Sequence, residues 1–514
     1  MMNLINKMLF FLFATTVVCG CSDSDGEESS GEVAPAGTDT YGYVTDSAGK
    51  PLEGIVVSDG YTCVATDATG LYSFSRNAAA YYVFYSLPAA YEVKISKLTG
   101  LPEFYAKLQR DRSRYDFMLT SLATAETQFD LFCIGDPQVN DMEQVARFRS
   151  ETVRDINAYG KTGTTPRYAI ALGDLVNNKW NMIPNMVSAM QQPKMGMPVF
   201  QTIGNHDHDY NASDNLAAQR TYESYCGPTN YSFDRGNVHI VSMDNVIHGC
   251  AASDAYEGGL LEWQYKWLEQ DLNYVAKDKM VIFCVHIPFR NGATSGGNSM
   301  NTDKYYNEVL ALLSQYASAT ILSAHTHSNQ NYIHTVNGKE IYEHVTGTTC
   351  GAWWRSTVCT EGTPNGYGVY HINGAAITDW LYKAVNYEDT YQIRLYRGTD
   401  KFNGGKSTYT FTKRAEGQII ANVWNADPAW KVNVYENGVK TGTMTAYADH
   451  DAWTVAYHVG AQGGSDSYDK KTDHLYYYTL QNPTATVRVE AVDRFGHTYT
   501  QTKFTDPLST PATY

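Results

Sequence analysis

The feature that most constrains this chain is a short apolar run that stops on a polar, chemically active residue. The clearest example is residues 198–203, which predict a buried strand and lead directly into Gly204-Asn205-His206-Asp207. This stop places an amide oxygen, an imidazole and a carboxylate in one loop, where rigid scaffolds usually carry binding and catalytic groups. Taken alone, the tetrapeptide is equally consistent with a turn that carries an ordinary surface histidine.

The same pattern recurs along the neighbouring sequence. Apolar runs at residues 129–134, 168–172, 238–243, 280–285 and 320–322 lead into Asp136, Asp174, Asp244, His286, and His325 with His327. Between them, residues 142–159, 261–275 and 306–316 repeat apolar residues with helical spacing. Strands that alternate with helices predict a layered α/β domain, and ligands bind at the carboxyl ends of such strands.

The series Asp136, Gly173-Asp174, Gly204-Asn205-His206-Asp207, His286 and His325-Thr326-His327 resembles the calcineurin-like metallophosphoesterase superfamily, over roughly residues 128–330. The resemblance implies a central β-sandwich flanked by helices, with two divalent metal ions (Mn, Fe, Zn or Mg) at the strand ends. Asp174 would bridge the metals. The first metal would be held by Asp136, Gln138 and His327, and the second by Asn205, His286 and His325.

The implied activity is hydrolysis of an extracytoplasmic phosphomonoester or phosphodiester by a metal-bound hydroxide. His206 would donate a hydrogen bond to a phosphoryl oxygen or protonate the leaving group, with Asp207 setting its orientation. The rival hypothesis is a non-catalytic surface lipoprotein that binds glycan or protein through its β domains.

One position departs from the family pattern, because Asp136-Pro137-Gln138 stands where Asp-x-His is common. A glutamine carbonyl oxygen is a weaker and harder ligand than imidazole, so the first metal should bind less tightly or favour manganese or magnesium over zinc. His208 is an alternative source of the missing imidazole. Purple acid phosphatases carry a metal-binding tyrosine three residues after the bridging aspartate, and Asn177 occupies that position here.

Three residues are candidates for substrate binding. Arg290 would clamp a phosphoryl oxygen, with a solvated loop arginine as the alternative. Trp353 and Trp354 lie in a polar, glycine-rich loop beyond the last metal motif. Successive side chains point different ways, so one of the two tryptophans is expected to face a substrate such as a sugar or base.

All-β domains are predicted on both sides of the metallophosphoesterase domain, which is assigned to residues 125–374. Residues 39–124 have strand-sized alternation broken by glycine turns and resemble the carboxypeptidase-regulatory-like β-sandwich, expected to act as a spacer or docking domain. Residues 375–514 predict a second β-sandwich, whose histidines lack ligand spacing.

The N-terminus predicts a lipid-anchored protein. Residues 1–20 resemble a lipoprotein signal peptide, with Cys21 as the lipid-bearing residue and residues 21–38 as a flexible acidic tether. The expected location is the cell envelope, at the periplasmic or surface-exposed face of the outer membrane; a cleaved secretory protein is the alternative. The expected partners are the membrane and a phosphoester substrate, with a glycan-linked ester as one option, and the oligomeric state is open.

Charge and cysteine content add two further expectations. A formal net charge of -15 argues against nucleic acid as a partner, since phosphate-backbone binding needs clustered Lys and Arg. Among the nine cysteines, Cys133 and Cys284 lie inside apolar strands and are expected to be buried thiols. The candidate disulfides are Cys226 with Cys250 and Cys350 with Cys359.

Overall fold

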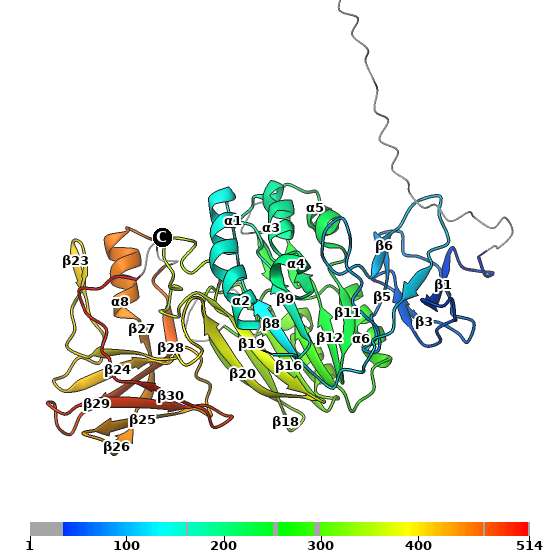
Figure 1. The fold of residues 1–514 in the computed structure, drawn as a ribbon. Coiled ribbons are helices and arrows are strands. Elements are labelled where there is room, and N and C mark those ends of the chain that lie inside the picture. The colour runs from blue at the N-terminus through cyan, green and yellow to red at the C-terminus, as the bar shows by residue number, and fades with distance from the viewer. Residues whose placement is uncertain (1–33, 161–162, 250–254, 292–298, 466–467, 512–514) are drawn as a thin grey trace, which may run out of the picture.

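The computed structural model describes residues 34–160, 163–249, 255–291, 299–465 and 468–511, arranged as three domains in a row (Figure 1). The predicted signal peptide, Cys21 and most of the acidic tether lie outside these residues. Within the described part, no helix combines the length and apolar character needed to cross a membrane.

The N-terminal domain consists of two small sheets. The first has the order β4-β1-β7 and the second β3-β2-β5-β6. Their strands are β1 (Thr40–Asp46), β2 (Val56–Ser58), β3 (Cys63–Ala65), β4 (Leu71–Phe74), β5 (Tyr82–Tyr85), β6 (Tyr105–Lys107) and β7 (Phe117–Leu119). The all-β prediction for this region is therefore confirmed.

This domain packs directly against the central domain. The indole N–H of Trp267 donates to Ser58 Oγ at 3.0 Å, and the Tyr82 hydroxyl donates to the Glu223 carbonyl. Leu87 forms an isolated bridge with Phe233, and its carbonyl accepts from the Asp234 amide. One continuous hydrophobic core spans both domains, which favours a docked domain over a loose spacer.

The central domain contains two facing sheets. The five-stranded sheet has the order β10-β9-β8-β19-β20 and the six-stranded sheet β11-β12-β15-β16-β18-β17. Their strands are β8 (Gln128–Ile134), β9 (Arg167–Leu172), β10 (Val199–Thr202), β11 (Tyr231–Arg235), β12 (Val238–Ser242), β15 (Met280–Cys284), β16 (Ser318–Ser323), β17 (Gln330–Val336), β18 (Lys339–Val345), β19 (Gly366–Asn373) and β20 (Ala376–Ala384). A small hairpin, β13 (Val246–His248) with β14 (Tyr256–Gly258), follows β12.

Helices cover the outer faces of both sheets. They are α1 (Met142–Phe148), α2 (Arg154–Tyr159), α3 (Ile183–Ala189), α4 (Gln192–Met195), α5 (Asn215–Cys226), α6 (Glu262–Asn273) and α7 (Asn307–Leu313). A π-helical turn, Arg149–Val153, joins α1 to α2, so the helix predicted over residues 142–159 is nearly continuous. Strand β8 shows the layering, because Leu131 and Cys133 belong to the core between the sheets while Phe132 and Ile134 pack with the helices.

The C-terminal domain pairs two four-stranded sheets, in the orders β21-β24-β28-β27 and β26-β25-β29-β30. Its main strands are β21 (Arg394–Arg397), β24 (Gln418–Asn422), β25 (Lys431–Glu436), β26 (Val439–Thr443), β27 (Thr445–His450), β28 (Lys471–Thr479), β29 (Val487–Val492) and β30 (Thr498–Gln501). A hairpin of β22 (Phe402–Gly404) and β23 (Ser407–Tyr409) and a short helix, α8 (Ala452–Val455), complete it. The predicted fold class, a helix-flanked central sandwich between two β domains, is confirmed.

The expected boundary at residue 375 needs correction. Strand β20 pairs with β19 across the Asn373-Gly374 turn, so the central sheet continues to Ala384. Gly374 has a φ of 60°, and a glycine turn inside a hairpin resembles a linker when only the sequence is known.

The described cysteines are buried free thiols. They include Cys133 and Cys284, as expected, and also Cys350 and Cys359, so the second candidate disulfide is not formed. Both of the latter sulfurs lie 3.6 Å from Thr348 Oγ1 instead. The first candidate pair requires Cys250, which lies outside the described residues.

Candidate metal centre

The predicted ligands meet at one edge of the central domain because each follows a strand that ends there. Asp136 follows β8, Asp174 follows β9, Asn205 follows β10, His286 follows β15, and His325 and His327 follow β16. Several take positive φ angles that non-glycine residues rarely adopt, namely Asp136 (42°), Gln138 (39°), Asp174 (50°), His325 (70°) and His327 (55°). Backbone strain of this kind gathers at functional sites, where the surrounding structure holds it in place.

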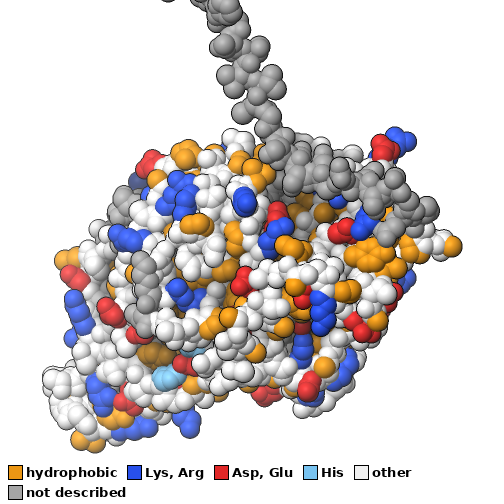
Figure 2. All heavy atoms as spheres, turned by 45° about the vertical axis from the view of Figure 1, so that its right-hand side comes forward, with side chains coloured by type: hydrophobic (Ala, Val, Ile, Leu, Met, Phe, Trp, Pro, Cys, Tyr) orange, Lys and Arg blue, Asp and Glu red, His pale blue; other side chains and the backbone are white. Residues whose placement is uncertain are grey.

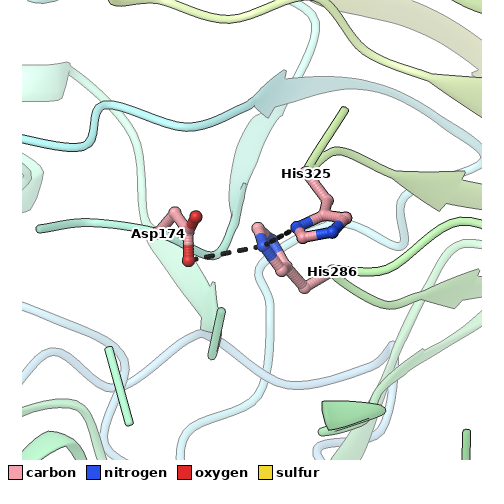
Figure 3. Close-up of side chains that lie close together, drawn as sticks. All are labelled: Asp174, His286 and His325. Atoms are coloured by element: carbon pink, nitrogen blue, oxygen red, sulfur yellow. Dashed lines mark hydrogen bonds and ion pairs between the residues drawn. The ribbon is translucent and has the colours of Figure 1, made fainter. Parts of the chain in front are cut away.

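Asp174 is shared by two groups of ligand atoms. One group joins it to His286 and His325, and the other to Asp136 and His327, with all atoms of each group within 4.8 Å of one another. Figure 3 shows Asp174, His286 and His325 pointing toward one another. A carboxylate common to two neighbouring groups is placed to bridge two cations.

The group of Asp174, His286 and His325, which is expected to hold the second metal, is short of positive charge. His286 Nδ1 lies 2.7 Å from the Leu172 carbonyl oxygen and donates to it. Its Nε2 faces Asn205 Oδ1 at 3.0 Å and Asp174 Oδ1 at 3.3 Å. Burial alone would lower the pKa of His286, but the Asp174 carboxylate raises this pKa to about 9. A proton or a metal cation is thus required among these three atoms, and a divalent cation fits the mixed imidazole and oxygen set.

The other group, which is expected to hold the first metal, contains a buried acceptor without a described partner. Gln138 Nε2 donates to Asp174 Oδ2 at 3.1 Å, whereas Gln138 Oε1 is buried with no hydrogen-bond partner among the described residues. His327 Nε2 lies 3.7 Å from Asp136 Oδ1 in the same group. An unsatisfied buried acceptor costs about 1–3 kcal/mol, and a cation would remove that cost. The residues of this group therefore fit a divalent cation.

The carboxylates of the site differ in electrostatic environment. Burial raises the pKa of Asp136 to about 8, with further contributions from neighbouring carboxylates. Burial also acts to raise the pKa of Asp174, but the His286 and His206 imidazoles lower it below its ordinary value. Carboxylates packed this closely need cations to share the site while ionised.

His206 lies at the same edge but is oriented by a residue that the sequence did not suggest. Its Nδ1 pairs with Asn178 Oδ1 at 3.0 Å. The Asp207 carboxylate instead accepts the backbone amides of Gly204 and Val176, at 3.0 and 3.2 Å, so the predicted orienting role of Asp207 is wrong. One of these amides belongs to the loop of Asp207 itself, and the other belongs to the loop that follows Asp174. The only sequence signal for Asn178 was its position in the loop that follows the bridging aspartate.

His208 is not free to serve as a replacement ligand. Its Nδ1 lies 2.8 Å from the Gly204 carbonyl oxygen and its Nε2 lies 3.0 Å from Asp244 Oδ2. Both ring nitrogens are therefore engaged, and the side chain is fully buried. Its contact with Gly204 supports the loop that carries Asn205 and His206.

The three candidate substrate residues differ in burial and in their contacts. The Trp353 ring stacks on His327, with ring centroids 4.3 Å apart and planes 24° apart. Trp354 is 5% exposed and its indole N–H donates to the Pro137 carbonyl at 2.8 Å, so it packs behind the first metal motif, and Trp353 is the tryptophan left as a candidate for substrate contact. Arg290 is exposed, and its guanidinium lies 5.0 Å from the Tyr332 ring centroid.

Facing sheets flanked by helices, with a carboxylate shared between two ligand groups at the strand ends, define a metal-dependent phosphoesterase. Family models agree in all three domains. The calcineurin-like phosphoesterase model matches residues 130–329, the model for its N-terminal part matches residues 38–122, and the model for its C-terminal part matches residues 343–499. The chain belongs to the calcineurin-like phosphoesterase family. It is accordingly a hydrolase that acts on phosphoester bonds, and its family uses dinuclear divalent metals.

The solved structures that match this chain are distant in sequence. A dimetal phosphatase from Danio rerio is 14% identical, with a TM-score of 0.33, and the match covers 49% of this chain and 98% of that one. A yellow lupin purple acid phosphatase is 12% identical, with a TM-score of 0.36 and coverages of 48% and 50%. A 5'-nucleotidase precursor from Thermus thermophilus is 10% identical, with a TM-score of 0.31 and coverages of 73% and 88%. A comparison with curated proteins found no match.

Proposed function

We propose that this protein hydrolyses a phosphomonoester or phosphodiester outside the cytoplasm, at a dinuclear metal centre bridged by Asp174. The observation that carries the proposal is the sharing of Asp174 by two groups of potential ligands. Asp136, Gln138 and His327 would hold one divalent cation, and Asn205, His286 and His325 the other. Two cations held there would neutralise phosphoryl charge and activate water.

Hydrogen bonds within the protein orient His286 and His206. His286 is held by its hydrogen bond to the Leu172 carbonyl, so its Nε2 is directed into the ligand group. The Asp174 carboxylate also accepts the His206 backbone amide at 2.8 Å, which ties the loop of His206 to the bridging residue. With Asn178 fixing its Nδ1 side, His206 would present Nε2 to a phosphoryl oxygen or to the leaving group.

The test combines metal analysis with turnover. Purified protein should contain close to two divalent metals per chain and should hydrolyse p-nitrophenyl phosphate, bis-p-nitrophenyl phosphate, or both. The relative rates on the two esters would distinguish a monoesterase from a diesterase. A glycan-linked ester is one candidate for the natural substrate. Absence of bound metal, together with no turnover after addition of manganese, zinc, iron or magnesium, would favour a non-catalytic binding lipoprotein.

The proposed location is the outer membrane, through a lipid on Cys21. The sequence around this residue resembles a lipoprotein signal, and a charged tether follows it. Cys21→Ala should move the protein from the membrane fraction to the soluble fraction while activity in detergent is unchanged. Unchanged membrane association would contradict the anchor.

In Figure 2, basic and acidic side chains are interspersed over the visible face, which adds no support for a nucleic-acid partner.

A further inference from the structure

A cavity of about 390 Å³ lies between the central and C-terminal domains. Its lining includes Asn140, Asn177, Trp353 and Arg355 from the central domain and Tyr468 from the C-terminal domain. Trp353 connects the cavity to the metal centre because its ring stacks on that of His327. The cavity volume falls within the range of small-ligand sites.

Hydrogen bonds fasten the C-terminal domain to the loops that form this cavity. His458 Nε2 lies 2.6 Å from Ser356 Oγ, close in sequence to Trp353 and Arg355. Asn329 Nδ2 donates to the Trp424 carbonyl oxygen at 2.7 Å, two residues beyond His327. All four of these residues are buried. These contacts fix the C-terminal domain, which carries Tyr468, against the loops of Trp353 and Arg355, and a binding site needs such a rigid support.

Both polar and aromatic groups line the cavity. Asn177 Nδ2 donates to Asn140 Oδ1 at 3.1 Å, so the two amides form one polar wall. The Trp353 and Tyr468 rings have centroids 4.9 Å apart and supply an aromatic surface. The exposed Arg355 places its guanidinium 4.9 Å from the Tyr468 ring centroid.

The ring geometry discriminates between two kinds of leaving group. The planes of Trp353 and Tyr468 are 67° apart, and one face of Trp353 is already covered by His327. These two rings therefore do not form a parallel slot for a flat nucleobase. A pyranose ring carries hydroxyl groups for amides and a guanidinium, and apolar C–H groups that pack on aromatic rings, so it fits this mixture better.

We infer that the C-terminal domain takes part in substrate recognition, and that Trp353, Arg355 and Tyr468 form a subsite for the sugar of a sugar phosphate. The inference rests on the proposed function, because it identifies the sugar as the alcohol that ester hydrolysis at the metal centre would release. The two side-chain amides and the Arg355 guanidinium would bind hydroxyl groups of the sugar.

The test compares esters that differ only in the alcohol. A hexose 6-phosphate and ethyl phosphate both release a primary alcohol, so the bond-breaking chemistry is matched. The parent protein should prefer the hexose phosphate by about tenfold or more in kcat/KM. Arg355→Gln and Tyr468→Ala should each reduce this preference by about fivefold or more, mainly through KM. The inhibition constant of inorganic phosphate should stay unchanged, because phosphate needs only the metal centre.

Arg397→Gln is the matched control, because Arg397 is also an exposed arginine above an aromatic ring, that of Phe504, but does not line this cavity. It should behave like the parent. Turnover by the parent without a preference for the hexose phosphate, or with a preference that both variants retain, would overturn the inference alone. A stronger preference for a nucleoside monophosphate would also overturn it. No turnover with any metal would overturn the proposed function and the inference with it.

Discussion

Gln138 contacts Asp174 through both its main chain and its side chain. Its backbone amide donates to the Asp174 carbonyl oxygen at 2.8 Å, and its Nε2 donates to Asp174 Oδ2 at 3.1 Å. With the amide nitrogen engaged in this way, Oε1 is the atom left to meet a cation, and it is buried without a described partner. The unusual glutamine of the first motif therefore contacts Asp174, the residue expected to bridge the two metals.

This relationship predicts how the first metal responds to substitution. Gln138→Ala should lower the affinity for the first metal by at least about tenfold, while the second metal stays bound. Tenfold is the lower end of the affinity loss that follows removal of an outer-shell residue. Gln138→His should tighten zinc at the same position, because imidazole is a better ligand for a borderline metal. Metal titrations by calorimetry would measure both effects. Superimposable titrations for the parent and both variants would show that Gln138 does not contact the metal.

Asp174→Asn should remove the charge that both ligand groups share. We expect loss of metal and a fall in kcat greater than the roughly hundredfold cost of losing an outer-shell partner. Asp303→Asn makes the same change at an exposed position and should have no effect. Elemental analysis and p-nitrophenyl phosphate turnover would provide the measurements. A fully metallated, active Asp174→Asn protein would exclude the bridging role.

Asn178→Ala should disturb His206 without disturbing the metals. Because Asn178 Oδ1 lies 3.0 Å from His206 Nδ1, its loss should lower kcat by about tenfold while the metal content is retained. The neighbouring exposed residue offers a control, Asn181→Ala, that should match the parent. His206→Ala should also keep its metals, and in that background Asn178→Ala should have little further effect. Additive losses in the double variant would mean that Asn178 acts separately from His206.

A buried histidine away from the site predicts a pH dependence of stability. His239, in β12, lies between Asp234 (2.7 Å) on β11 and Asp271 (2.8 Å) on α6, and Lys279 binds the same Asp234. Burial alone would lower the pKa of His239, but the two carboxylates raise it to about 9.

The folded-state pKa of His239 therefore lies above the unfolded value of about 6.5. Its contribution to the free energy of unfolding should be complete below pH 6.5 and should be lost as the pH rises through about 9. Asp271→Asn removes one carboxylate, so it should lower the melting temperature at pH 6 and flatten its decline between pH 7 and 10. Thermal unfolding followed by circular dichroism would measure this. Parallel pH profiles for the parent and the variant would contradict the assignment.

Much of the central domain was determined by local sequence. Each apolar run followed by a ligand residue became a strand that ends at one edge, as with β8 before Asp136 and β9 before Asp174. Strand burial and strand ends depend on short stretches of residues, so the sequence alone predicted the layered fold and the set of residues that meet at its edge. The helices at residues 142–159 and 261–275 followed for the same reason, since their apolar spacing matches the helical period.

Tertiary structure decided which side chain contacts which. The sequence could not separate Trp353 from Trp354, because their directions depend on positive φ angles of 46° and 64° in a loop packed against other segments. It assigned the orientation of His206 to its neighbour Asp207, whereas the partner is Asn178, 28 positions away in the chain. It also did not connect Tyr468 with Trp353, which belong to different domains. These contacts join residues far apart in sequence, so they form only when the sheets, loops and C-terminal domain pack together.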